Sequence, residues 1–379
     1  MDGKRILIVG GGIAGLGLYN MLSSQKTHRI DLLEKQTQLA TNGTGITLGI
    51  NTIKILQTLG LFDPIAKKGR VLDRFEITDQ AGKILSSVGI SRKIQQQNLA
   101  TYGIHRTDLH KIFAVNLNPS HLQLGKTVDR LVPGNKKIEI TFSDGTQSEY
   151  DLIFGADGIY SQIRNMLWPD STLRYSGYSC WRCLIPTNNS DRATEMWGKG
   201  KRLGIIPINT SQSYVFLVIN SLAGVESKET FSIQRIKKLY NKFGGPAQSV
   251  LDRLDRLEAL THNDLYDLPT PQLGDKRILL LGDAAHAATP NLGQGASMAI
   301  EDAFRLSKII LNASNDEDIS SLYRSIRMPR VKRVVDMSYN FGRIAQWEST
   351  PGVVLRNAAM RLTPDRMNAG RMERFLLDY

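Results

Sequence analysis

Apolar residues in this chain form short, nearly uninterrupted runs that are separated by glycine-rich bends and amphipathic segments. The run at 278–281 has the composition of a strand that is buried on both faces of a parallel sheet, and further strands are expected at 4–9 and 29–33. Helical periodicity follows the strand expected at 4–9 through Leu22, and it returns over Ala296–Ile310. This alternation of strands and helices predicts an α/β protein built on an open parallel sheet.

A second pattern, in which apolar and polar residues alternate, predicts another sheet-rich layer. A hairpin at Val71–Ser87 would turn at Gln80–Gly82, and further strands are expected at Gln123–Leu131, Lys137–Phe142, within Tyr175–Asn220 and at Leu265–Leu268. Expected helices lie at Asn51–Leu59, Thr107–Val115, Ser232–Phe243 and, with breaks at Pro329, Pro351 and Pro364, over Ile319–Tyr379.

The bend after the first strand has the features of a dinucleotide-binding turn. Gly10, Gly12 and Gly15 fit G-x-G-x-x-G between a strand and a helix, which permits a tight turn and the approach of a pyrophosphate. Glu34 ends the second strand, where a carboxylate can bind a ribose 2′-hydroxyl. Because an acid there leaves no room or charge for a 2′-phosphate, we expect FAD or NAD as the firmly held nucleotide, and not NADP.

A later bend repeats this strand-to-helix arrangement. Asp283 follows the strand at 278–281, and Pro290, Gly293 and Gly295 form a loop before the helix that is expected from Ala296. Free N–H groups and the positive dipole end at the start of a helix suit a cofactor that becomes anionic, as a flavin does when reduced.

The segment DLIFGADGIYSQIR, residues 151–164, contains a third such bend. Its Asp157 is a candidate residue on the cofactor side, and capping of the following helix is the alternative role.

Composition and charge narrow the possible classes of protein. The chain has 379 residues, 41% hydrophobic content and a net charge of +12, without an apolar run typical of a membrane span or a signal peptide. Residues 321–379 hold eleven Lys or Arg against five Asp or Glu, which could attract nucleic acid or an anionic membrane. Their helical spacing favours a solvated helix face instead. We therefore expect a cytoplasmic monomer or homodimer with no nucleic-acid partner and no stable membrane association.

The two cysteines, Cys180 and Cys183, have a C-x-x-C spacing that could indicate zinc or a redox pair. Zinc would need two more ligands, and the surrounding segment is an expected strand, in which positions three apart point to opposite faces. We predict two buried thiols and no metal site.

Together the three bends resemble motifs of the single-component FAD-dependent aromatic hydroxylases, which include 4-hydroxybenzoate and salicylate hydroxylases. The motifs are the glycine turn with Glu34, GADGIYSQIR at 155–164 and LLLGDAAHAATPNLGQG at 279–295. The resemblance covers nearly the whole chain and implies a 4-hydroxybenzoate hydroxylase-like fold. This fold would have a Rossmann-like FAD-binding domain (1–70, 101–172 and 268–345), a sheet-rich substrate domain (71–100 and 173–267) and a C-terminal helical tail (346–379).

The resemblance also implies the cofactor contacts. Glu34 would bind the ribose, Arg106 the pyrophosphate, the Val128 backbone the adenine, Asp283 the ribitol and the loop Gly293–Ala296 the isoalloxazine. The full set of candidate cofactor-binding residues is Gly10, Gly12, Ile13, Ala14, Gly15, Glu34, Lys35, Ile46, Thr47, Arg106, Val128, Asp157, Asp283, Pro290, Gly293, Gln294, Gly295 and Ala296.

Within the family, the chain is most similar to the branch that contains salicylate hydroxylase and the FAD-dependent urate hydroxylase. In the latter, an Arg and a Tyr at the positions of Arg202 and Tyr214 serve the substrate. Arg202 would hold an anionic substrate, and Tyr214 would orient or deprotonate it; a sheet-surface ion pair and a core aromatic are their alternative roles. Arg182 stands where the urate enzyme has an amide residue, and His286 is expected to be structural.

The implied activity is hydroxylation of a small aromatic or heteroaromatic substrate. NADPH or NADH, bound transiently, would reduce the tightly bound FAD, and O₂ would then form a flavin C4a-hydroperoxide that transfers oxygen to the ring. One alternative is a flavoprotein oxidase or dehydrogenase on the same scaffold, and another is a monooxygenase that modifies tetracyclines or polyketides. A third is a basic nucleic-acid or membrane-surface protein that has kept an FAD fold.

Overall fold

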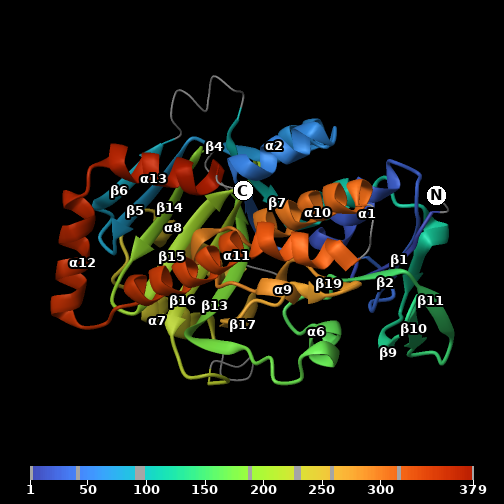
Figure 1. The fold of residues 1–379 in the computed structure, drawn as a ribbon. Helices are drawn as coiled ribbons and strands as arrows, with labels where there is room; N and C mark the ends of the chain where they lie inside the picture. Colours follow the sequence, from blue (N-terminus) through green and yellow to red (C-terminus); the bar gives the residue numbers. More distant parts are fainter. Residues whose placement is uncertain are drawn as a thin grey trace.

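Two large β-sheets, each with its own hydrophobic core, organise the computed structural model (Figure 1). The structure describes residues 3–39, 43–89, 99–186, 190–225, 232–256, 260–313 and 317–377. The six-stranded sheet has the order β18 (Gly274–Asp275), β19 (Ile278–Leu280), β12 (Leu152–Gly155), β1 (Arg5–Val9), β2 (Arg29–Glu34) and β8 (Leu122–Leu124). The seven-stranded sheet has the order β17 (Thr261–Asp267), β13 (Arg174–Pro186), β16 (Gln212–Asn220), β15 (Lys201–Pro207), β14 (Arg192–Trp197), β5 (Arg74–Asp79) and β6 (Ile84–Gly89).

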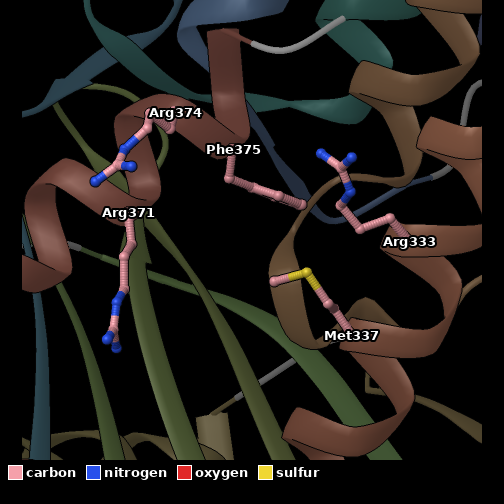
Figure 2. Close-up of a pocket in the computed structure, with 5 residues that line it drawn as sticks. All are labelled: Arg333, Met337, Arg371, Arg374 and Phe375. Carbon is pink, nitrogen blue, oxygen red and sulfur yellow. The ribbon is translucent and has the colours of Figure 1, made fainter.

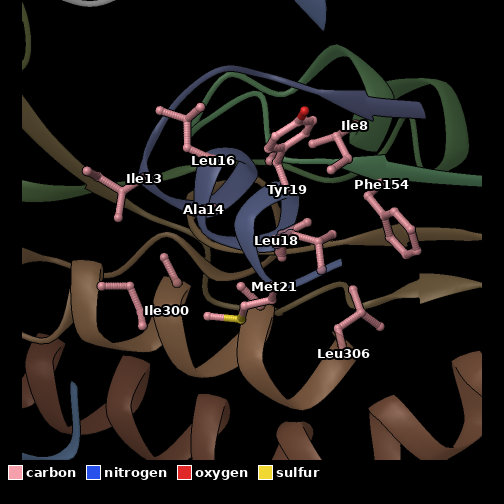
Figure 3. Close-up of a cluster of buried hydrophobic side chains, with 14 of the residues drawn as sticks. Ile8, Ile13, Ala14, Leu16, Leu18, Tyr19, Met21, Phe154, Ile300 and Leu306 are labelled. Carbon is pink, nitrogen blue, oxygen red and sulfur yellow. The ribbon is translucent and has the colours of Figure 1, made fainter. Parts of the chain in front are cut away.

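The centre of the six-stranded sheet is parallel, as the apolar runs predict. β1 pairs in parallel with both β12 and β2, and β19 pairs in parallel with β12. Helix α1 (Ile13–Ser23) lies between these strands and helix α10 (Gly295–Asn312) (Figure 3). The two helices pack against each other at Gly17 of α1, where an added Cβ would make ordinary van der Waals contact, at 3.5 Å, with the Cβ of Ala303 on α10.

The seven-stranded sheet has two faces of different character. One face is covered by α7 (Ile233–Tyr240) and α8 (Pro246–Arg253), which pack on side chains such as Trp181, Leu203 and Leu217. Because side chains alternate along a strand, the opposite face carries the residues that are displaced by one position along β13, β15 and β16. They are Cys180, Arg182, Arg202, Gly204, Tyr214 and Phe216.

Two three-stranded sheets complete the β-structure. One contains β9 (Val128–Pro133), β10 (Ile138–Phe142) and β11 (Gln147–Tyr150), and the other contains β3 (Gly45–Leu48), β7 (Thr101–His105) and β4 (Arg70–Leu72). The prediction of one strand over Gln123–Leu131 is wrong, since β8 joins the six-stranded sheet and β9 joins β10. The chain bends between them at Gly125, whose φ of 69° lies in the left-handed region that glycine adopts easily.

The remaining helices cover the sheets and form the C-terminal part of the chain. They are α2 (Ile50–Thr58), α3 (Phe62–Lys68), α5 (Arg106–Ala114), α6 (Gln162–Leu167), α9 (Asp283–His286), α11 (Glu317–Ala345), α12 (Thr350–Leu362) and α13 (Asp365–Leu377), with short 3₁₀ turns η1 (Pro119–His121), η2 (Leu254–Arg256) and η3 (Pro290–Leu292). Figure 1 shows α12 and α13 in red beside β5 and β6. Among the described helices, none combines the length and the apolar character needed to cross a membrane.

Two expectations for the C-terminal region are corrected. Pro329 does not break the helix, because α11 continues through it, whereas Pro351 lies in the first turn of α12 and Pro364 precedes α13. The expectation that the basic residues form a solvated face is wrong for Arg327, Arg330 and Arg356, which are all buried. The side chain of Arg356 donates to the Ala345 carbonyl at 2.7 Å, so it fastens α12 to the end of α11.

A buried ionic network joins α10 to α11. Glu301 and Asp302, both 0% exposed, lie on α10, and Arg327 on α11 pairs with Glu301 at 2.9 Å and with Asp302 at 2.7 Å. Arg330 adds a second pair with Glu301 at 3.1 Å. Asp302 also accepts hydrogen bonds from the Gly282 N–H at 2.9 Å and from His286 Nε2 at 2.5 Å, which confirms the structural role expected for His286.

We expect Asp302→Asn to lower the free energy of unfolding by about 3–5 kcal/mol, because it leaves the buried Arg327 guanidinium without one of its counter-charges. Denaturant titration of both proteins measures the change. Asp336→Asn, which removes the exposed Lys332–Asp336 pair of α11, is the matched control and should cost less than about 1 kcal/mol. Equal effects of the two substitutions would contradict the assignment.

The buried Asp302–Arg327 pair should also make the stability of the folded protein depend on pH. Burial alone would raise the pKa of Asp302, but His286 and Arg327 outweigh it and lower this pKa to about 2, from an ordinary value of 3.8. The stabilisation is therefore present above the ordinary pKa and is lost as the pH falls through the lower one.

Candidate functional site

The three bends predicted from the sequence meet in space. Gly10 has a φ of 111°, and a Cβ added there would overlap the carbonyl of Ala156 at the end of β12. Gly282 follows β19 with a φ of 61°, and its added Cβ would lie 3.0 Å from the Cβ of Ala14 on α1. The carboxyl ends of β1, β12 and β19 therefore converge at the start of α1, the edge of an open sheet where ligands bind.

Two helix N-termini open toward free space at this edge. Gly12 is the N-cap of α1 and Gln294 is the N-cap of α10, and neither helix start is capped by a side chain. An added Cβ at Gly12 or at Gly295 would meet no atom within 4 Å among the described residues. The first N–H groups of these two helices are therefore available to an anionic ligand, as a dinucleotide pyrophosphate or a reduced flavin requires.

Carboxylates flank this space on both sides. Glu34 accepts hydrogen bonds from the backbone N–H groups of Gly11 at 2.8 Å and Gln36 at 2.9 Å, which fixes it beside the glycine turn with further lone pairs available. The neighbouring Lys35 is exposed. Asp283 is exposed at the start of α9, and no described residue donates a hydrogen bond to its carboxylate. Both carboxylates are placed to accept hydroxyl groups of a ligand.

Contacts of β3 and α2 with the loop before α10 bring further candidate residues together. Thr47 Oγ1 donates to the Gly293 carbonyl at 3.4 Å, and Ile46 precedes it on β3. Gln294 accepts from Asn51 Nδ2 at 3.4 Å, and Asn51 donates at 2.5 Å to the buried Glu301. The ionic network thus extends to the loop, which begins at η3 with Pro290.

Three other candidates lie at the edges of this arrangement. The exposed side chain of Arg106 begins α5, and a Cβ added at Gly43 would lie 2.9 Å from the Cβ of Arg106. Val128 is buried at the start of β9, opposite Phe142. Asp157 accepts from the N–H groups of Gln162 at 2.8 Å and Ile163 at 3.2 Å, so it has the capping role that the sequence left open.

Arg202 is 2% exposed, and its guanidinium is held by three side chains. It pairs with Glu195 at 3.0 Å and donates to Gln346 Oε1 at 3.0 Å and to Asn291 Oδ1 at 2.8 Å. These bonds tie β15 to η3 and to the end of α11. The ion pair with Glu195 favours a positioning role for Arg202, and its direct contact with substrate stays a prediction.

Tyr214 lies on the same face of the sheet, next to β3. A Cβ added at Gly45 of β3 would overlap the Cβ of Tyr214, so the backbone of β3 packs directly against the Tyr214 side chain. The Arg182 guanidinium interacts with the Tyr214 hydroxyl, and burial raises the pKa of Tyr214 above its ordinary value of 10.0. The hydroxyl is therefore protonated at neutral pH and can donate a hydrogen bond, but it is not a ready base.

The cysteines agree with the sequence expectation of plain thiols. Both are free and buried, and they point to opposite faces of β13. Burial raises the pKa of Cys180 and raises that of Cys183 to about 12, so both are neutral thiols at physiological pH. Over the described part of the chain, no cluster of His, Cys, Asp and Glu has a metal-binding arrangement.

An open cavity of about 520 Å³ lies between α11 and α13. Its lining residues are Arg333, Met337, Arg371, Arg374 and Phe375, none of which belongs to the glycine motifs. Figure 2 shows the guanidinium groups of Arg333 and Arg371 pointing in opposite directions. The chemistry of the converging bends, rather than the size of this cavity, therefore defines the candidate site.

The sequence analysis missed the residues that support the site from behind. Asn51, Asn291 and Glu301 each connect a predicted motif to a second element. One available signal was the pair of adjacent acids at 301–302, which are flanked on both sides by apolar residues (Ala299, Ile300, Ala303 and Phe304) and so require buried partners.

Three comparisons place this geometry among known proteins. A model of the family described as FAD binding domain matches residues 4–338. A 2-heptyl-3-hydroxy-4(1H)-quinolone synthase of Pseudomonas aeruginosa is 35% identical over 364 residues, which cover 95% of this chain and 94% of that protein. An aurachin C monooxygenase/isomerase of Stigmatella aurantiaca is 29% identical and covers 97% and 96%, respectively.

The fold is also similar to that of a solved structure. The crystal structure of HpxO of Klebsiella pneumoniae complexed with FAD and uric acid superposes with a TM-score of 0.92, at 23% identity, covering 100% of this chain and 98% of that chain. At this level of identity the likeness shows a shared fold.

Gly12→Val should remove bound flavin without unfolding the protein, because the added side chain enters space that no described residue fills. We expect the 450-nm flavin absorbance of the purified variant to fall to roughly half of the wild-type value or lower. The flavin-free protein should still unfold cooperatively. Gly370→Val on α13, where an added Cβ also meets nothing within 4 Å, is the control and should keep the flavin. Full flavin content in Gly12→Val would show that the cofactor does not occupy this space.

Proposed function

Because this chain belongs to the FAD binding domain family, we propose that it uses NADPH or NADH together with O₂ to hydroxylate a small heteroaromatic ring. Membership of the family predicted from the three motifs is confirmed, and the chain is an FAD-dependent aromatic monooxygenase. The observation that carries the proposal is the convergence of three strand ends on two uncapped helix starts. In the balanced reaction, substrate, O₂, NAD(P)H and a proton give hydroxylated substrate, water and NAD(P)⁺.

The residues at the converging bends fit FAD, and each has a distinct proposed contact. The start of α1 at Gly12 would hold the pyrophosphate, with Arg106 nearby, and Glu34 would bind the adenosine ribose. Asp283 would bind the ribitol hydroxyls, and the loop from Gly293 would support the isoalloxazine. When bound, FAD supplies the redox chemistry that accepts two electrons from the nicotinamide and delivers one atom of O₂ to the ring.

The chain's own groups would stabilise charge and exclude water. The positive end of the α10 dipole would stabilise negative charge that develops on the pyrimidine side of the cofactor. Tyr214, as a neutral phenol, would donate a hydrogen bond to an oxygen atom of the substrate. Arg202 would act by holding β15, η3 and the end of α11 in register.

The proposed class of substrate is supported by the name of one relative and by the aromatic side chains of the seven-stranded sheet. The name of the quinolone synthase relative specifies a quinolone ring with an alkyl chain. We therefore propose that a fused, nitrogen-containing ring occupies the face that carries Tyr214 and Phe216. Alkylquinolones, urate and hydroxypyridine carboxylates form the first screening panel.

Turnover in ¹⁸O₂ tests the proposal directly. We expect substrate-stimulated oxidation of NADPH or NADH, and product that contains one ¹⁸O atom by mass spectrometry. An oxidase or dehydrogenase would oxidise the substrate without transferring ¹⁸O to it. Purified protein that lacks flavin and cannot be reconstituted with FAD, or product without ¹⁸O, would refute the monooxygenase assignment.

We expect Tyr214→Phe to lower kcat/KM by roughly 2- to 10-fold, as loss of one hydrogen bond implies. Because burial raises the pKa of Tyr214, its hydroxyl stays protonated between about pH 6 and 9, and the shape of the pH profile should not change. The measurement is kcat/KM against pH for both proteins. If kcat/KM of the wild type instead rises with pH in this range, and this rise is absent in Tyr214→Phe, the tyrosine acts as a catalytic base.

A further inference from the structure

Arg182 lies on the face of the seven-stranded sheet that also carries Tyr214. In the β13–β16 ladder, Arg182 stands opposite Phe216 and Leu184 stands opposite Tyr214. Positions two apart share a face, so Arg182, Tyr214 and Phe216 are neighbours on one surface. This surface is opposite to the one that α7 and α8 cover.

The charge of Arg182 has no counter-charge in the described part of the chain. Its Nη1 donates to Asn263 Oδ1 at 3.0 Å, and it interacts with the hydroxyl of Tyr214, but no described carboxylate lies within ion-pair distance. Burial raises the pKa values of the two nearest titratable groups, Cys180 and Tyr214, so both are neutral near pH 7. Arg182 is half-buried, so its guanidinium remains accessible to a ligand that could pair with it.

Arg202 provides the contrast on the same face. Glu195 neutralises it at 3.0 Å, and Gln346 and Asn291 occupy two further donors of its guanidinium. Of these two arginines, Arg182 is therefore the one whose positive charge can pair with a ligand.

Aromatic surface lies directly beside this cation. Gly204 lacks a side chain where the Phe216 ring lies over β15, and the centroids of the Tyr214 and Phe216 rings are 5.8 Å apart. A flat ring can stack here while an oxygen atom at its edge reaches Arg182 and the Tyr214 hydroxyl.

We propose that Arg182, assisted by Tyr214, binds an anionic oxygen of the substrate and so selects rings that carry a carboxylate or an ionised hydroxyl. This inference rests on the proposed function, because it requires that this face binds the substrate. Arg182 would then be a specificity-determining residue that contacts substrate. Where the bound oxygen is an ionised hydroxyl, it would also donate electron density to the ring, as oxygen transfer to carbon requires.

The test uses flavin-loaded enzyme and matched pairs of ligands, each an aromatic carboxylate and its neutral carboxamide, on benzene, quinoline and 4-quinolone rings. Dissociation constants come from the change in flavin absorbance on titration. The wild-type protein should bind at least one carboxylate roughly ten-fold or more tightly than its carboxamide. Wild-type protein without such a preference for any pair would overturn the proposal.

Arg182→Gln should abolish the preference by weakening carboxylate binding roughly ten-fold, with carboxamide binding changed less than about two-fold. Arg182→Lys should keep part of the preference, because it retains a charge without the planar fork. Arg192→Gln, which removes an exposed arginine on β14 of the same sheet, is the control and should leave both constants unchanged. Equal loss for both ligands, or no loss, would overturn the role of Arg182.

Flavin content and ¹⁸O incorporation are measured on the same preparations. Wild-type protein that holds no flavin, or that transfers no ¹⁸O to its product, refutes the proposed function itself. Intact flavin and oxygen transfer, together with an unchanged carboxylate preference in Arg182→Gln, refutes only the inference about Arg182. If Arg182→Gln does not fold, Arg182→Lys carries the test, because the loss of donor geometry should still lower the preference.

Discussion

Two adjacent carboxylates inside α10 can be buried only because α11 presents two guanidinium groups to them. The rest of the site depends on this pairing. Asp302 holds the Gly282 N–H at the turn after β19, and Glu301 holds Asn51, which in turn reaches Gln294 at the start of α10. One ionic network therefore fixes both the turn that presents Asp283 and the loop proposed to hold the isoalloxazine.

Small residues determine how closely the elements around the cofactor space approach each other. Gly10 lies against the Ala156 carbonyl, and Gly282 lies against Ala14, so three strand ends meet without intervening side chains. Gly12 and Gly295 differ from these, because no described atom lies near an added Cβ there. The first pair makes the packing of the protein possible, whereas the second pair leaves space for a ligand.

Local patterns were sufficient to predict the parallel sheet, the glycine turn and the family. They failed where the outcome depends on distant partners. Apolar alternation over 123–131 could not reveal that Gly125 redirects the chain into another sheet, and the spacing of basic residues could not reveal that Arg327 lies buried against Asp302. The positions of Arg202 and Tyr214 were predicted by resemblance, but the ion pair of Arg202 with Glu195 and the burial of Tyr214 depend on distant partners. The domain boundaries and the residue roles stay predictions.

The short strand β3 contacts both the loop before α10 and the seven-stranded sheet. On one side Thr47 bonds to the loop at Gly293, and on the other Gly45 lies against Tyr214. A side chain larger than hydrogen at position 45 would overlap Tyr214 and Ile208. We therefore expect changes in substrate preference to be constrained on this side and freer at β13 and β17, where the Arg182 side chain donates to Asn263. Divergence among enzymes built in this way should concentrate at those two strands.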